Sequence, residues 1–208
     1  VKDVYGGIID ILMKDKDITM AAKFLDKCLQ AIVDEKYPMD KLVITKSLRS
    51  GYKNPSQIAH KVLADRIRKR DPGNKPSNGD RVAFVYIETP NKKALQGDKI
   101  ETPEFIVENN IKINYTFYIT NQLMKPIQQV FALVLEKLPA FNIKMGTNCR
   151  LWKNKLKRLR KDYPDDETYN KKLEDLRVKE VKTILFDKYL LQISKKQNGD
   201  RDISSFYK

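Results

Sequence analysis

Residues 42–87 decide the fold, and they read LVITKSLRSGYKNPSQIAHKVLADRIRKRDPGNKPSNGDRVAFVYI. Leu42–Thr45 and Val82–Ile87 are rich in β-branched and aromatic residues, which is typical of strands. Between them, Asn54 followed by Pro55 predicts a helix start, because asparagine caps helices and proline suits the first helical position. An apolar arc at helical spacing follows, formed by Ile58, Ala59, Val62, Leu63 and Ile67. The stretch therefore predicts two strands that bracket one helix.

Two proline-containing segments connect this helix to the second strand. Asp71-Pro72-Gly73 ends the helix. Pro76-Ser77-Asn78-Gly79 then predicts a turn, because asparagine and glycine accept the positive φ that entry into the second strand requires.

The same stretch carries half of the chain's net charge. Residues 44–81 contain ten Lys or Arg and three Asp, a net charge of +7, whereas the formal charge of the whole chain is +14. This segment is less than a fifth of the chain. A field of this size attracts a polyanion, and nucleic acid is the commonest one.

Length and composition predict a soluble globular protein. The 208 residues, 41% hydrophobic and 33% charged, are enough for one large or two small domains. No apolar run reaches the roughly 18 residues of a membrane span and no secretory signal is seen, so we expect no membrane partner. The first residue is valine rather than methionine, which predicts a piece of a longer protein. Cys28 and Cys149 are far apart in sequence, which predicts two free thiols in a reducing compartment.

Helical spacing of apolar residues predicts two helices before residue 42. The first covers Val1–Met13, and Thr19 caps the second. The second helix ends at Tyr37-Pro38, because proline disfavours helical geometry in the residue before it.

After residue 87 the chain again reads as mainly helical. Residues 88–103 predict a loop, and residues 114–138 predict a helical segment in which Pro126 causes a kink or joins two helices. Residues 139–148 predict a linker or loop. The expected fold class is therefore mainly α with a small β element (α+β).

Residues 150–161, RLWKNKLKRLRK, predict a basic amphipathic helix. Seven of these twelve residues are basic, and the apolar ones fall within one arc: Leu151, Trp152, Leu156 and Leu159. Such a helix fits contact with a DNA backbone, contact with a membrane surface, or a solvated outer face, and the sequence leaves these three open. A polar break at residues 162–166 precedes another long helix over residues 167–197, which is apolar on nearly all sides between Ile184 and Leu191.

Five short motifs keep a characteristic order and spacing within residues 42–87. They are Val43-Ile44-Thr45-Lys46-Ser47-Leu48, Ala59-His60, Leu63-Ala64, Arg68-Lys69-Arg70-Asp71-Pro72-Gly73 and Gly79-Asp80-Arg81-Val82. In these motifs the chain resembles the palm-to-thumb region of family B DNA polymerases, above all the delta-like enzymes of eukaryotes and of large DNA viruses. A looser resemblance runs from Val1 to about Leu138, and from about Asn142 onward no family pattern is recognised.

The resemblance implies a function and a domain organisation. The chain would be the C-terminal thumb part of a DNA-directed DNA polymerase, a nucleotidyltransferase, that grips the primer-template duplex during DNA replication. Residues 1–41 would end the palm and lead into the thumb, and residues 42–138 would form the helical thumb domain. Residues 139–197 would be a basic helical C-terminal extension, and residues 198–208 a tail. The partners would be the duplex and the palm and fingers of the same polymerase.

The resemblance also implies that catalysis lies outside this chain. In this family the aspartates that hold two metal ions lie upstream of this region, and the fingers lysines that grip the nucleotide are absent here. We therefore expect no catalytic residue, metal ligand or cofactor in this chain, which alone should be inactive, while Mg²⁺ is implied for the whole enzyme. The expected location is intracellular, with the nucleus and a cytoplasmic virus factory both open.

The predicted DNA-binding residues are cations, small polar residues and one histidine. Lysine and arginine pair with phosphates, and glycine lets backbone N–H groups come close to one. The predicted set is Lys46, Ser47, Lys53, His60, Lys61, Arg68, Arg70, Gly79 and Arg81. For each cation the alternative is an ordinary exposed surface charge, and His60 either touches DNA or merely packs. Asp80 is expected to orient Arg81 or to cap the turn.

The chain ends with QNGDRDISSFYK, which is similar to a clamp-binding peptide of replication proteins, or PIP box. Ile203, Phe206 and Tyr207 keep the required spacing of one aliphatic and two aromatic residues, which would fill an apolar pocket on a sliding clamp. Asp200 stands where such peptides have glutamine, so a frayed C-terminus that happens to contain aromatics is the alternative.

Two other classes of function also fit the sequence. One is a stand-alone basic nucleic-acid-binding subunit, and the other is a scaffold whose basic face binds an acidic protein; neither would have enzymatic activity. His60 is the only histidine, which excludes a triad with a spare histidine base and a His-rich metal site. The chain also lacks a Gly-rich phosphate-binding loop.

Overall fold

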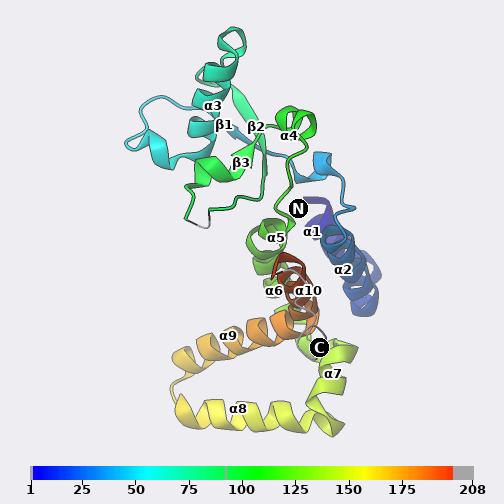
Figure 1. Ribbon diagram of the computed structural model, residues 1–208. Coiled ribbons are helices and arrows are strands. Elements are labelled where there is room, and N and C mark those ends of the chain that lie inside the picture. Colours follow the sequence, from blue (N-terminus) through cyan, green and yellow to red (C-terminus); the bar gives the residue numbers. More distant parts are fainter. Residues whose placement is uncertain (1, 92, 199–208) are drawn as a thin grey trace, which may run out of the picture. The chain divides into compact units, whose positions relative to one another are not determined.

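The computed structural model describes residues 2–91 and 93–198, which fold into two compact units (Figure 1). Unit 2 is continuous and comprises residues 37–118. Unit 1 combines the described parts of residues 1–36 and 119–208. The chain thus leaves unit 1 once, builds unit 2, and returns.

Unit 2 is built on a three-stranded antiparallel sheet with the order β1-β2-β3. The strands are β1 (Ile44–Ser47), β2 (Arg81–Tyr86) and β3 (Ile100–Glu101). The two strands predicted from the sequence are confirmed, with β1 displaced by two residues and β2 by one. Their register pairs Ile44 with Phe84 and Ser47 with Arg81. Part of the predicted loop over residues 88–103 is instead ordered as a 3₁₀ turn, Gln96–Lys99, followed by β3.

Helix α3 (Ala59–Arg70) lies between the first two strands in sequence, but it starts later than predicted. The expected start at Pro55 is wrong: Pro55–Gln57 form a 3₁₀ turn, and the side chain of Asn54 makes no capping hydrogen bond. This turn satisfies its own carbonyls through hydrogen bonds to the next residues, and Ile58 then adopts an extended conformation. The carbonyl of Ile58 accepts the first helical hydrogen bonds. The helix ends at Asp71, as predicted.

The alternation of side chains along β2 gives unit 2 two apolar clusters. Val82 and Phe84 pack against Leu63 and Ala64 of α3. Val85 and Ile87 belong to a second cluster, which also contains Leu42, Ile106 and Tyr118. The helices α4 (Pro103–Glu108) and α5 (Tyr115–Phe117) supply residues to this second cluster. The central strand β2 therefore contributes to an apolar cluster on each of its two faces.

Unit 1 is helical. It contains α1 (Lys2–Asp10), α2 (Ile18–Val33), α6 (Met124–Leu133), α7 (Pro139–Met145), α8 (Arg150–Asp162), α9 (Asp166–Leu185) and α10 (Asp187–Asn198). Asp17, rather than the predicted Thr19, caps α2, because its carboxylate accepts a hydrogen bond from the Met20 N–H at 2.9 Å. A π-helical segment, Tyr118–Leu123, leads into α6 and places Pro126 in the first turn of that helix. This confirms the junction of two helical segments predicted near Pro126.

The prediction of a linker over residues 139–148 is wrong, because most of it is α7. Pro139 lies in the first turn of α7, where the missing N–H of proline costs no hydrogen bond. Phe141 and Met145 are fully buried. Beyond α7, the predicted long helix is divided into α9 and α10 at Phe186. Phe186 is buried, as expected for the apolar segment, whereas Leu191 is 63% exposed.

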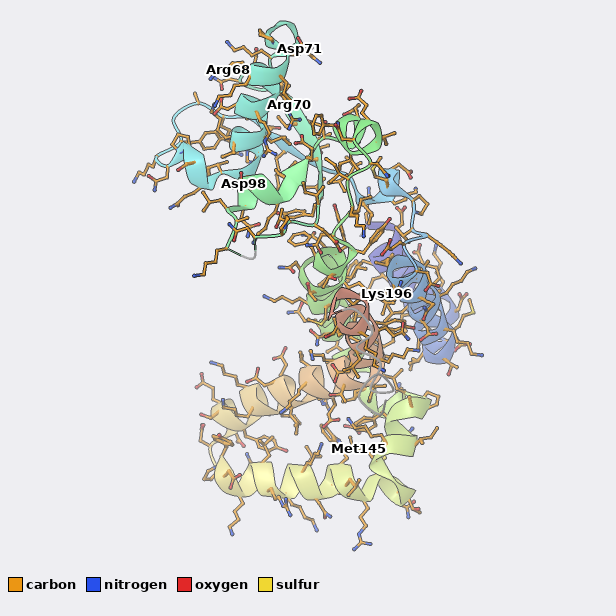
Figure 2. All side chains as sticks on the ribbon, in the orientation of Figure 1. Arg68, Arg70, Asp71, Asp98, Met145 and Lys196 are labelled. Atoms are coloured by element: carbon orange, nitrogen blue, oxygen red, sulfur yellow. The ribbon has the colours of Figure 1, made fainter. Side chains whose placement is uncertain are left out.

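Helix α10 joins the end of the chain to its beginning within unit 1. The hydroxyl of Tyr189, a fully buried residue, donates to the backbone oxygen of Asp26 at 3.1 Å. Lys196, labelled in Figure 2, donates to the carbonyl of Val33 at the end of α2 at 2.6 Å. The last part of the predicted C-terminal extension, α10, therefore packs with α2. The domain boundaries implied by the resemblance concern function, and they stay a prediction.

Candidate nucleic-acid interface

A shallow cavity of about 400 Å³, which we call the β1 cavity, lies in unit 2 beside the first strand. Strand β1, the segment after it, the first turn of α3 and the start of β2 supply its lining: Thr45, Lys46, Ser47, Arg49, Tyr52, His60 and Arg81. These residues include three permanent cations and no acidic side chain. The β1 cavity is therefore suited to an anion.

Pairing of the first two strands fixes one of these cations. Antiparallel register places Arg81 opposite Ser47, and the Arg81 guanidinium donates to Thr45 Oγ1 at 2.6 Å. A guanidinium has five N–H groups, so this bond orients the side chain and leaves other donors for a ligand. Both Thr45 and Arg81 are exposed, which keeps the remaining donors accessible.

A chain of hydrogen bonds orders the other side of the β1 cavity. The Tyr52 hydroxyl accepts from the Arg49 backbone N–H at 2.9 Å and lies 3.1 Å from His60 Nε2. The hydroxyl donates to Nε2 in one tautomer of the ring and accepts from it in the other. The two rings meet edge to face, with centroids 6.0 Å apart. The imidazole of His60 is also hydrogen-bonded to the Ser47 backbone, so it joins α3 to β1.

This environment keeps His60 neutral. Burial lowers the pKa of His60 below its ordinary value of 6.5, the nearby Lys46 ammonium lowers it further, and the hydrogen bond to Ser47 offsets part of the shift. The positive charge of the β1 cavity at neutral pH therefore comes from Lys46, Arg49 and Arg81.

Two predicted cations, Lys61 and Arg68, lie at a neighbouring cavity of about 330 Å³. They share one carboxylate: Asp65 Oδ1 is 2.6 Å from Lys61 Nζ and 3.6 Å from an Arg68 guanidinium nitrogen. Lys75 also lines this cavity. Because Asp65 offsets part of the charge, this second cavity is a weaker anion site than the β1 cavity.

Arg70, in the last turn of α3 (Figure 2), serves an internal contact. Its guanidinium donates to Glu101 Oε2 at 2.7 Å and lies 3.5 Å from the ring centroid of Phe105. Arg66 donates to the same carboxylate oxygen at 3.1 Å, and Glu101 is only 1% exposed. Arg70 thus attaches α3 to the segment from β3 to α4, and the structure places it apart from the β1 cavity lining.

The remaining predicted residues have separate positions. Gly79 has the positive φ expected from the sequence, +94°, but its N–H donates to the Leu48 carbonyl at 2.9 Å and is not free for phosphate. Asp80 caps this turn, as predicted, by accepting from the Ser77 N–H at 2.7 Å. Lys53 is exposed between β1 and α3. The three residues of the predicted clamp-binding peptide lie outside the described residues: Ile203, Phe206 and Tyr207.

Sequence reasoning missed three residues of the β1 cavity: Thr45, Arg49 and Tyr52. Thr45 had a signal, because period-two alternation in a strand puts it on the same face as Ser47. Arg49 was visible only as one of ten basic residues. No sequence pattern links Tyr52 to His60, because an irregular segment and a 3₁₀ turn separate them.

Two other kinds of site are absent from the described part of the chain. Residues 2–91 and 93–198 contain no group of three or more His, Cys, Asp or Glu side chains that could hold a metal ion. Among the same residues, no helix has the length and apolar character needed to cross a membrane. Cys28 and Cys149 are both free thiols, as predicted.

Comparison with known proteins assigns the family. Residues 1–134, which include the whole of unit 2, match DNA polymerase family B. The chain belongs to the family B DNA polymerases. Over its whole length this family B chain is 50% identical to the DNA polymerase of Pyramimonas orientalis virus, of which it covers 17%. It is 48% identical, over 65% of its length, to the DNA polymerase of Acanthamoeba polyphaga mimivirus, of which it covers 8%.

Cellular relatives of this family B chain are also similar. The DNA polymerase delta catalytic subunit of Schizosaccharomyces pombe is 40% identical over 60% of the chain, which covers 11% of that subunit. A solved family B DNA polymerase from Pyrobaculum calidifontis aligns with 58% of the chain, at a TM-score of 0.46 and 22% identity, and the chain covers 16% of it. The chain thus spans less than a fifth of each of these relatives.

Proposed function

We propose that this chain is the thumb part of a DNA-directed DNA polymerase and that it holds the primer-template duplex by its phosphates. The observation that carries the proposal is the β1 cavity, where three cations and no carboxylate meet in a family B chain. The viral relatives of this chain are named as DNA polymerases, which supports DNA as the polyanion that binds here.

In this proposal the β1 cavity acts by positioning. Arg81, Arg49 and Lys46 donate to phosphate oxygens, and the hydroxyl groups of the cavity lining add weaker donors. Contacts to phosphates fix the register of a protein on a duplex without reading its sequence. A replicative enzyme has to move over every sequence, so this kind of contact suits the role.

Chemistry is left to residues outside this chain. Mg²⁺ is implied for the whole enzyme, and no step of the proposal involves a metal. The chain would work together with the palm and fingers of the same polymerase. Binding of a sliding clamp through Ile203, Phe206 and Tyr207 stays a prediction.

Fluorescence anisotropy of the 208-residue chain with a primer-template duplex and with single-stranded DNA, over a salt series, tests the proposal. We expect tighter binding to the duplex, and a plot of log affinity against log salt with a slope of about −0.9 per phosphate contact. Three cations in the β1 cavity predict a slope of about −2.7 or steeper. Tighter binding to polyglutamate than to the duplex would contradict the proposal and favour a scaffold for acidic proteins.

A further inference from the structure

A second cationic surface lies in unit 1, on the side of α8 that faces away from its neighbours. Five residues form it, and we call them the outer row: Arg150, Lys153, Lys157, Arg158 and Lys161. All five are exposed, and none forms an ion pair with a described residue. Figure 2 shows nitrogen-tipped side chains along the side of α8 that points away from α9.

Packing fixes which side of α8 is free. Trp152 is 2% exposed, its ring meets Phe141 edge to face at 5.3 Å, and its indole N–H donates to Glu136 Oε1 at 3.3 Å. Leu156 and Leu159, on the same arc, are half-buried. With 3.6 residues per turn, the outer row lies on the opposite side of the helix.

The other two cations of α8 are engaged in internal pairs. Lys155 binds the buried carboxylate of Glu180, which also accepts from Lys144 at 2.7 Å. Burial acts to raise the pKa of Glu180, but the two lysines outweigh it and hold that pKa below its usual range. Arg160 pairs with Asp166 at 2.5 Å. These pairs hold α8 against α7 and α9, so the outer row has a fixed direction.

We propose that the outer row binds the phosphate backbone of a nucleic acid, as a second contact surface separate from the β1 cavity. Lys153, Lys157 and Lys161 follow each other at intervals of about 6 Å along a helix about 20 Å long. A duplex carries one charge per about 1.7 Å of its axis, so several phosphates come within reach of the row at once. The only acidic residue of α8 is Asp162, at its end.

The same packing argues against a membrane as the ligand. A helix that lies on a membrane inserts large apolar and aromatic side chains next to its basic face. Here the only tryptophan is committed to the interior of unit 1, and Leu151, 54% exposed, is the one apolar residue of α8 that is largely accessible. A surface that gathers five cations matches a ligand that is charged throughout its length.

The outer row lies beyond the part of the chain that matches DNA polymerase family B, which ends at residue 134. The relative from Pyramimonas orientalis virus matches the whole chain. The inference rests on the proposed function only in taking nucleic acid as the ligand, and its residues are in the other unit of the structure.

Anisotropy with a 20-base-pair duplex over a salt series tests the inference on four forms of the 208-residue chain. These are the unchanged chain, the helix variant K153Q/K157Q, the cavity variant K46Q/R81Q, and the two combined. For the helix variant we expect the magnitude of the salt slope to decrease by about 1.8. The affinity for the duplex near 0.1 M salt should fall at least about tenfold. The matched control is K171Q/K179Q on α9, where two exposed lysines share a helix with Glu174 and Asp175; it should change the slope by less than half as much.

The design separates the two proposals. An unchanged slope in the helix variant together with a lower slope in the cavity variant would overturn the inference and leave the proposed function standing. The reverse result would support the inference and overturn the role of the β1 cavity. If the helix variant loses binding to phosphatidylserine vesicles or polyglutamate while its duplex affinity is unchanged, the outer row serves a different ligand and the inference fails. Circular dichroism of each variant confirms that the helices are intact.

Discussion

At the scale of single residues, the β1 cavity contains one side chain whose ordinary pKa lies near neutral pH, His60. Burial and the Lys46 ammonium both lower the pKa of His60. Its ring is hydrogen-bonded to the Ser47 backbone and lies 3.1 Å from the Tyr52 hydroxyl, which can donate to a bare Nε2 or accept from a protonated one. At neutral pH the positive charge around the cavity is therefore that of Lys46, Arg49 and Arg81.

Replacing Lys46 should reveal its effect on the pKa of His60. In Lys46→Gln the positive neighbour is gone, so the pKa of His60 should rise toward its ordinary value of 6.5. Because His60 is the only histidine, its imidazole protons give a single titration curve by NMR. Lys53→Gln is the control, since Lys53 is not among the causes of the shift. An equal pKa in both variants and in the unchanged chain would show that Lys46 does not act on His60.

Glu101 stabilises unit 2 through ion pairs with two arginines. Its carboxylate is almost fully buried and accepts from Arg66 and Arg70 as well as from the Thr102 N–H at 3.0 Å. Removing one partner of a buried ion pair lowers the free energy of unfolding by about 3–5 kcal/mol. The loss is smaller where the remaining charges reach water, as these two arginines partly do.

We expect Glu101→Gln to lower the free energy of unfolding by about 2 kcal/mol, because it leaves two guanidinium groups without a charged partner. Urea denaturation followed by circular dichroism measures this. Glu108→Gln, a change of the same kind at an exposed position, should stay within about 0.5 kcal/mol of the unchanged chain. Similar losses in the two variants would mean that the pairing around Glu101 contributes nothing specific.

At the scale of elements, close packing fixes α3 against the turn that precedes β3. A Cβ built on Gly97 would lie 2.6 Å from the Cβ of Val62, a side chain that is branched next to the helix backbone and has little freedom to move. The guanidinium of Arg66 also donates to the Gly97 carbonyl. The turn Gln96–Lys99 is thus seated directly on α3.

Gly97→Ala should therefore lower the free energy of unfolding by about 1–3 kcal/mol, the usual cost of overpacking. Val62→Ala removes the side chain that the new methyl group meets, so the double variant should lose less than the sum of the two single changes. Thermal denaturation of the three variants gives this coupling. Strictly additive losses would indicate that the two residues do not meet.

The sequence predicted those elements whose signals are local. Strands β1 and β2 follow from β-branched residues, the end of α3 follows from Asp71-Pro72-Gly73, and the positive φ of Gly79 follows from its turn. The late start of α3 was missed because Pro55–Gln57 close a turn of their own. Helix α7 was missed because Pro139 suggested a linker, although proline equally suits a first helical turn.

The site was predictable only in part, for a related reason. Lys46, Ser47, His60 and Arg81 do converge on one cavity, because strand pairing brings residues 47 and 81 together and α3 starts beside them. Arg70 stays a predicted DNA contact, but its charge does not reveal that a buried carboxylate thirty-one positions away accepts a hydrogen bond from it. Tertiary partners of this kind leave no local pattern.

At the scale of the whole molecule, positive charge is gathered on two surfaces that belong to different units. The β1 cavity is in unit 2, which lies inside the segment that matches the family. The outer row is in unit 1, on α8, which follows that segment, and α10 of the same unit contacts α2 through Tyr189 and Lys196. Each surface can be tested with the other unchanged.

The measurement that tests the central claim most directly is the salt slope of duplex binding by the cavity variant K46Q/R81Q. We expect the magnitude of the slope to decrease by about 1.8 relative to the unchanged chain, because two phosphate contacts are lost. The matched control K93Q/K112Q removes two exposed lysines of unit 2 that do not line the β1 cavity, and it should decrease the slope by less than half as much. Equal slopes in the cavity variant and the unchanged chain would contradict the assignment of the β1 cavity as the surface that grips DNA.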